Sequence, residues 1–182
     1  MNEKELIEKC KSGEKDAFKK LYETYSQYAM GICFRYTGDE MLAEDVLHDG
    51  FIRVFAAIHS FQYREEGSLK AWLKRIFCNE SLYFLKKNKL WNNFIPIQDY
   101  DVPEEEPDIS SWRTIPKEVL MQYISRLSVG YRIVFNLYMF ENLSHKEIGK
   151  QLGIKEEASR SRLSRAKAIL TKQIKEYISK HA

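Results

Sequence analysis

The densest set of side chains that could do chemistry lies near the C-terminus, where four cations fall within residues 160–167. Arginine can donate two hydrogen bonds to one guanine, and any of these cations can neutralise a phosphate. The short hydroxyl residues between them can approach base edges or phosphates. The run therefore predicts a contact with nucleic acid, and a solvated basic helix is the alternative. The cations are Arg160, Arg162, Arg165 and Lys167, and the hydroxyl residues are Ser161 and Ser164.

Helical spacing divides this run into two sets. The apolar residues Leu163, Ala166 and Leu170 mark the buried side of the predicted helix. The opposite face is predicted to enter the major groove and carries Arg160, Ser161, Ser164 and Arg165. The predicted phosphate contacts are Arg162 and Lys167.

A helix-turn-helix is the element expected to position these side chains. Ser144 and Glu147 have the spacing of a capping box, in which each side chain accepts a hydrogen bond from the other residue's backbone N–H. Gly153 suits a left-handed turn, and its small size is expected to let two helices cross closely. The second helix, predicted over residues 155–179, would then lie in the major groove of DNA.

Helical periodicity extends along the rest of the chain, and no segment alternates as a strand would. Residues 96–107 contain three of the four prolines, and residues 96–108 contain six acidic residues and no basic one, which predicts an extended linker. The expected fold is all-α, with two small helical domains over residues 1–92 and 114–182 joined by an acidic linker over residues 93–113. The remaining helices are predicted over residues 3–11, 16–36, 40–59, 68–89, 116–127 and 129–140, with Asp39 and Ser68 as N-caps.

Composition narrows the classes of function. The net charge is only +3, but residues 109–182 carry 14 basic and 6 acidic residues, which favours a polyanionic partner. The three cysteines and four histidines are scattered, so neither a metal site nor a cofactor is expected. No paired carboxylates, nucleophile elbow or phosphate loop predicts catalysis. The chain has no apolar run of membrane-spanning length and no secretory signal near residue 1, so we expect no membrane insertion and a cytoplasmic location.

The motifs resemble those of a known family. Residues 115–170, which include SHKEIGKQLGIKEEASRSRLSRAKAIL, look like the sigma-4 domain of sigma-70-type factors. Residues 16–61, which include AEDVLHDGFIRVF, and residues 68–87 look like the sigma-2 domain. The two domains stand in the expected order with only a short linker between them, which resembles the extracytoplasmic-function (ECF) group. This resemblance implies a promoter-specificity subunit of bacterial RNA polymerase.

The resemblance also assigns roles to residues of the first domain. One set would bind the clamp helices of the polymerase beta-prime subunit, although core packing is an equal alternative for Leu47 and Phe51. His48 stands where the family usually has glutamine, and Gly50 where it has a larger apolar residue. The clamp set is Asp45, Leu47, His48, Asp49, Phe51 and Arg53. The set implied for the melted −10 strand is Tyr63, Arg64, Lys70, Lys74, Arg75 and Asn79, with Lys86 and Lys87 on duplex phosphates.

In the second domain, the resemblance directs the recognition helix to the −35 element. Ser159 stands where the family usually has valine, and is expected to weaken packing at the start of that helix. The acidic linker would thread toward the polymerase active-site cleft, or else serve as a charged spacer. The implied partners are core RNA polymerase (beta-prime clamp helices and beta flap), promoter DNA and an anti-sigma factor. The alternative is a helix-turn-helix regulator that binds operator DNA without being a polymerase subunit.

Overall fold

The computed structural model describes residues 2–90 and 109–181, and every regular element within these ranges is a helix. The chain divides into two compact units, residues 1–87 and 88–182. Helix boundaries agree with the sequence predictions within two residues, because most helix ends carry a local signal such as a cap or a glycine. The predicted path of the acidic linker toward the polymerase cleft concerns residues outside the described ranges.

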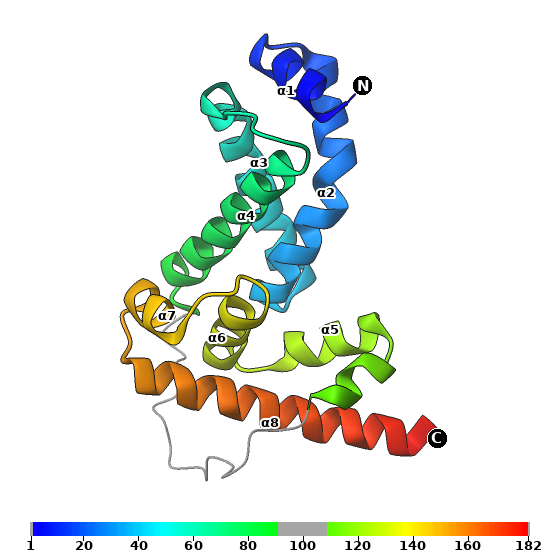
Figure 1. Cartoon of the computed structure of the whole chain (residues 1–182), viewed down its shortest axis with the longest axis vertical. Helices are drawn as coiled ribbons and strands as arrows, with labels where there is room; N and C mark the ends of the chain where they lie inside the picture. The colour runs from blue at the N-terminus through cyan, green and yellow to red at the C-terminus, as the bar shows by residue number, and fades with distance from the viewer. Residues whose placement is uncertain (1, 91–108, 182) are drawn as a thin grey trace. The chain divides into compact units, whose positions relative to one another are not determined.

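The first unit is a bundle of four helices, shown in blue to green in Figure 1. Three long helices, α2 (Lys15–Thr37), α3 (Glu40–Ala57) and α4 (Ser68–Lys87), pack against one another. The short helix α1 (Glu3–Lys11) packs on α2 and on the 3-10 turn η1 (Ile58–Ser60), which follows α3. Fully buried side chains such as Leu21, Tyr36 and Phe77 fill the space between the helices.

The beginning of α4 differs from the prediction. Ser68 was expected to cap this helix, but it is the first helical residue, and its hydroxyl accepts a 3.5 Å hydrogen bond from the backbone N–H of Arg64. The carboxylate of Glu3, on α1, accepts hydrogen bonds from the backbone N–H groups of Gly67 and Leu69 instead. The cap of α4 therefore comes from a residue more than sixty positions away in the sequence.

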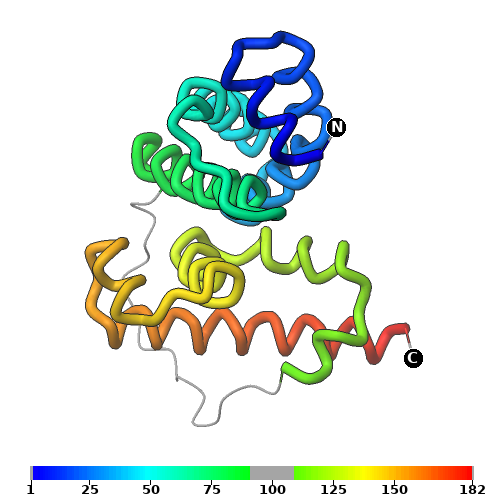
Figure 2. The backbone as a smooth tube through the Cα atoms, turned by 45° about the horizontal axis from the view of Figure 1, so that its top comes forward, coloured from blue at the N-terminus to red at the C-terminus, as the bar shows by residue number. Residues whose placement is uncertain are grey.

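The second unit is built around one long helix, α8 (Glu156–His181), which contacts every other element of the unit. These elements are α5 (Lys117–Arg126), α6 (Val129–Met139), α7 (His145–Leu152) and the 3-10 turn η3 (Ser110–Thr114). Figure 2 shows α7 beside the start of α8 and α6 beside the next turns of its N-terminal half. Pro116, predicted in the first turn of a helix, is the N-cap residue just before α5.

The predicted linker over residues 93–113 is too long at its C-terminal end. Residues 110–114 form η3, and Trp112 is buried there with its ring 5.8 Å from that of Phe135. The indole Nε1–H donates a 3.2 Å hydrogen bond to Thr171 Oγ1 on α8. A large aromatic residue next to the acidic run anchors this segment to the second unit, so the packed structure begins before residue 114.

The three cysteines are buried, as expected for small apolar residues, and burial raises the pKa of the Cys33 thiol to about 12. A thiol with so high a pKa is unreactive at neutral pH. Within residues 2–90 and 109–181, no helix has the length and the apolar character needed to cross a bilayer.

Candidate DNA-binding and docking surfaces

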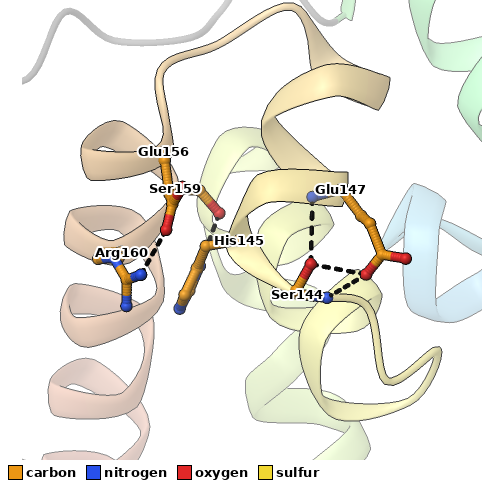
Figure 3. A network of polar contacts seen from close by, with 6 residues as sticks. All are labelled: Ser144, His145, Glu147, Glu156, Ser159 and Arg160. Carbon is orange, nitrogen blue, oxygen red and sulfur yellow. Dashed lines mark hydrogen bonds and ion pairs between the residues drawn. The ribbon is translucent and has the colours of Figure 1, made fainter.

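The capping box at the start of α7 is confirmed. The backbone N–H and the hydroxyl of Ser144 both donate to Glu147 Oε2, at 2.8 and 2.6 Å, and the Glu147 N–H donates to Ser144 Oγ at 3.3 Å (Figure 3). These hydrogen bonds to Ser144 hold the pKa of the Glu147 carboxyl below its usual value. Reciprocal capping fixes the point at which the first helix of the helix-turn-helix begins.

Two glycines shape the turn, and each has a different task. Gly153 has a φ of 68°, so it supplies the left-handed conformation that the sequence predicted. A Cβ atom at Gly153 would meet nothing within 4 Å, so the expectation that it permits a close helix crossing is wrong. The close approach lies at Gly149, where a Cβ atom would stand 2.8 Å from the backbone oxygen of Ile154. The sequence analysis did not identify Gly149 as the point of close approach. A glycine inside a short helix was the signal that could have indicated it.

A polar contact joins the starts of the two helices in the motif. His145 Nδ1 lies 2.9 Å from Ser159 Oγ, and the imidazole ring stacks on Tyr138 with centroids 4.8 Å apart. Burial and, next, the charge of Arg160 lower the pKa of His145, which favours the neutral ring. Figure 3 shows this bond bridging α7 and α8. Ser159 is fully buried, so its hydroxyl has the partner that a buried polar group requires.

The basic face of α8 is only partly available. Arg160 is exposed and paired with Glu156 one turn earlier, while Ser161 and Ser164 are half-buried. Arg165, predicted to reach the major groove, retains only 7% exposure. The predicted phosphate contacts Arg162 and Lys167 are also buried.

The tyrosine Tyr138 of α6 covers one of these cations, Lys167. The Lys167 Nζ atom lies 5.8 Å from the centroid of the Tyr138 ring on α6, and burial lowers the pKa of Arg162. Long cationic side chains often cover apolar surface with their stems in this way. The structure therefore presents Arg160, Ser161 and Ser164 together, and it does not present the other three predicted contacts beside them.

A groove of about 620 Å³ lies between α2 and α3 in the first unit. It contains three of the six residues predicted to dock on a partner, Leu47, His48 and Phe51. Phe51 is 3% exposed and packs on Tyr22 and Phe77, so it serves the core more than the surface. Ile52 and Tyr22, which the docking prediction missed, also line the groove and are about half exposed, at 55% and 44%.

The other three predicted docking residues lie outside this groove. Asp45 and Asp49 are exposed. The Arg53 guanidinium forms an ion pair with Glu80 of α4 and lies 5.5 Å from the Tyr83 ring centroid. Glu80 is 5% exposed, and burial raises the pKa of its carboxyl while Arg53 opposes that rise. Arg53 is therefore the counter-ion of a buried carboxylate.

Replacing Arg53 with alanine is expected to lower the stability of the first unit by about 1–2 kcal/mol at neutral pH. Without Arg53, the pKa of Glu80 rises further, so the carboxyl stays neutral to a higher pH than in the wild type, and once it is charged it lacks the Arg53 counter-ion. The stability deficit of R53A relative to wild type should thus grow with pH. Urea unfolding between pH 4 and 8 measures it. The double variant Arg53→Ala/Glu80→Gln should lose the pH dependence, and a deficit that is constant with pH would contradict this role.

Two of the residues predicted to meet the −10 strand lie in different surroundings. Lys70 Nζ lies 4.7 Å from the centroid of the Tyr28 ring, whereas Asn79 lines a second groove of about 670 Å³ together with Arg53 and Tyr83. Trp72, which lies on α4 between Lys70 and Lys74, is half-buried against Phe61. Tyr63 and Lys74 are half-buried, and Arg64, Arg75, Lys86 and Lys87 are exposed.

The second unit contains a helix-turn-helix, an element found in many DNA-binding proteins, and comparison with known sequences identifies the family. The Sigma-70 region 2 family matches residues 21–90, and the Sigma-70, region 4 family matches residues 117–170. The chain belongs to the sigma-70 family, in its ECF group of promoter-recognising RNA polymerase sigma factors. The homologous proteins are sigma factors, which are not enzymes.

Two curated relatives show the extent of the similarity. ECF sigma factor SigE of Mycolicibacterium smegmatis is 30% identical over 162 residues, which cover 83% of this chain and 57% of SigE. ECF sigma factor SigW of Bacillus subtilis is 27% identical over 191 residues, which cover 95% of this chain and 97% of SigW. The solved structure of CnrH in complex with the cytosolic domain of CnrY has a TM-score of 0.47 at 23% identity, covering 94% of this chain and 96% of that one.

Proposed function

We propose that this chain binds core RNA polymerase through the groove between α2 and α3 and reads the −35 duplex with the start of α8. The observation that supports the proposal is that one chain has both features: an apolar groove in the first unit and an exposed arginine on the helix-turn-helix of the second. Apolar side chains such as Ile52 supply contact area for a protein partner. Arg160 supplies the donors that suit guanine.

The test of this proposal is run-off transcription with purified core polymerase on a pool of genomic fragments. Adding the chain should yield discrete, promoter-dependent transcripts, and binding of the free chain to the same fragments should be weak and salt-sensitive. If the chain binds duplex DNA tightly but never directs transcription, the result contradicts the polymerase role and supports the alternative, a regulator that binds operator DNA.

The residue assignments have their own test at Arg160. Replacing it with alanine is expected to weaken holoenzyme binding to a −35 duplex by about 10- to 100-fold and to relax the preference at one base pair, because a bidentate guanine contact is lost. Polymerase binding should be unchanged. Competition binding with a labelled duplex measures the effect. Arg126→Ala, which removes an exposed arginine from the end of α5, is the matched control. If both variants lost duplex affinity equally, Arg160 would contribute only through its positive charge and not through a specific base contact.

The remaining parts of the proposal follow from the family. The site of action would be the cytoplasm, where core polymerase is found. We also propose that the second unit contacts the beta flap, that the acidic linker approaches the active-site cleft, and that an anti-sigma factor binds the chain. Co-purification of the tagged chain from cells of its host would identify such a partner.

A further inference from the structure

Helix α1 lies outside the residues that match the sigma-70 region 2 family, which begin at residue 21. Its first residue nevertheless reaches the segment that joins α3 to α4. The two carboxylate oxygens of Glu3 each lie 3.1 Å from the backbone nitrogen of Gly67, and Oε1 lies 3.3 Å from the backbone nitrogen of Leu69. Both N–H groups donate to Glu3.

These contacts give hydrogen-bond acceptors to the free N–H groups at the start of α4, the helix that the proposed function requires for −10 strand binding. The first N–H groups of any helix have no partner within it, and a negative charge there is stabilised by the helix dipole. Gly67 has a φ of 89°, a conformation that suits glycine, and it leads directly into α4. Glu3 therefore holds the point at which the chain turns from the loop over residues 61–67 into the helix that carries Lys70, Lys74 and Asn79.

Helix α1 also fixes the other end of the same loop. It packs against η1, which precedes residue 61, and Figures 1 and 2 both show α1 beside this part of the chain. Leu6, Ile7 and Cys10 bury one side of α1 in the first unit, so the helix is firmly seated. Burial and, next, the charge and hydrogen bonding of Glu3 raise the pKa of the Tyr25 hydroxyl, so Glu3 also interacts with α2. The loop is thus held at both ends by an element outside the family match.

We propose that Glu3 is a positioning residue for promoter opening, which sets the conformation of the loop over residues 61–67 so that it can capture the melted −10 strand. This inference rests on the proposed function, because it assumes that the loop meets single-stranded DNA. Glu3 itself need not touch DNA. Its carboxylate keeps the loop in one conformation before the strand arrives, and a preorganised loop binds more tightly than one that must be ordered.

The experiment compares full-length variants in holoenzyme with core polymerase. Glu3→Ala removes the acceptor, and Glu3→Gln keeps one oxygen that can accept a hydrogen bond. Glu5→Ala is the matched control, since Glu5 lies in the same first turn and its side chain forms an ion pair at 3.4 Å with Lys9, in which both side chains are partly exposed. A promoter fragment selected with wild-type holoenzyme is the probe, and permanganate reactivity of unpaired thymines measures opening.

Glu3→Ala is expected to reduce the open complex about 3- to 30-fold, the range expected for loss of a helix cap. Glu3→Gln should recover part of the loss, and Glu5→Ala should behave as wild type. Binding to a −35 duplex and to core polymerase should be unchanged in all three variants. In the free chain, amide hydrogen exchange at Gly67 and Leu69 should speed up most in Glu3→Ala, less in Glu3→Gln and not in Glu5→Ala.

Any of three results would overturn the inference. The first is that Glu3→Ala opens the promoter as well as the wild type does. The second is unchanged hydrogen exchange at Gly67 and Leu69, which needs no promoter and so tests the loop even if wild-type holoenzyme is inactive. The third is an equal loss of opening, −35 binding and polymerase binding, which would indicate general unfolding and exclude a positioning role. Failure of the proposed function is distinct, because the wild-type chain itself would then direct no transcription.

Discussion

Replacing Gly50 with leucine, which restores the kind of larger apolar residue that the family usually has there, is expected to destabilise the first unit by about 3 kcal/mol. A Cβ atom at Gly50 would stand 2.3 Å from Cε1 and 2.6 Å from Cδ1 of Phe77, whose ring is fully buried. The ring cannot move aside without disturbing its contact with Phe51. Urea unfolding monitored by circular dichroism measures the loss, and −35 duplex binding by the second unit should survive.

Two further variants separate this steric cause from helix propensity. Gly31→Ala is the control, because Gly31 lies within α2 with nothing within 4 Å of its Cβ position, and the change should stabilise the chain by about 0.5–1 kcal/mol. Adding Phe77→Ala to Gly50→Leu should recover part of the stability, because the new side chain can then occupy the space of the ring. Additive losses in that double variant would mean that Gly50 and Phe77 are not complementary.

The pair Gly50 and Phe77 illustrates what the sequence could and could not predict. A glycine inside a helix was visible as a departure from the family, and it implied a cost of about 1 kcal/mol relative to alanine. The compensating ring is 27 positions away, on α4, and no local pattern connects the two. Helix ends were predictable for the opposite reason, since caps such as Asp39 and Ser144 act within three residues.

The same distinction holds for the candidate sites. The order of the two units, the capping box and the left-handed Gly153 all follow from short-range signals, and each was predicted. The partner of Arg53 and the cap supplied by Glu3 depend on contacts between helices that are distant in sequence. A helical wheel placed Arg165 on an open face, but exposure also depends on what packs around the helix.

Replacing Gly149 with valine is expected to cost the second unit about 2–3 kcal/mol and to weaken −35 duplex binding at least tenfold. The new Cβ atom would lie 2.8 Å from the Ile154 backbone oxygen, and a backbone group cannot rotate away as a side chain can. The turn would have to open, which strains the 3.0 Å hydrogen bond from the Ile154 N–H to the Gly149 oxygen. Opening the turn shifts α8 relative to α7, so Arg160 would no longer lie where the motif places it.

A pair of asparagine variants distinguishes this steric role from a need for backbone freedom. Gly153→Asn should be tolerated, with a cost of about 1 kcal/mol or less, because asparagine adopts the left-handed conformation and the space around Gly153 is open. Gly149→Asn should resemble Gly149→Val, because any Cβ atom meets Ile154. Thermal unfolding and duplex competition binding on the wild type and on the Gly149→Val, Gly149→Asn and Gly153→Asn variants give the comparison. If Gly153→Asn proves the more damaging change, conformational freedom at the turn, and not close approach, limits the geometry of this helix-turn-helix.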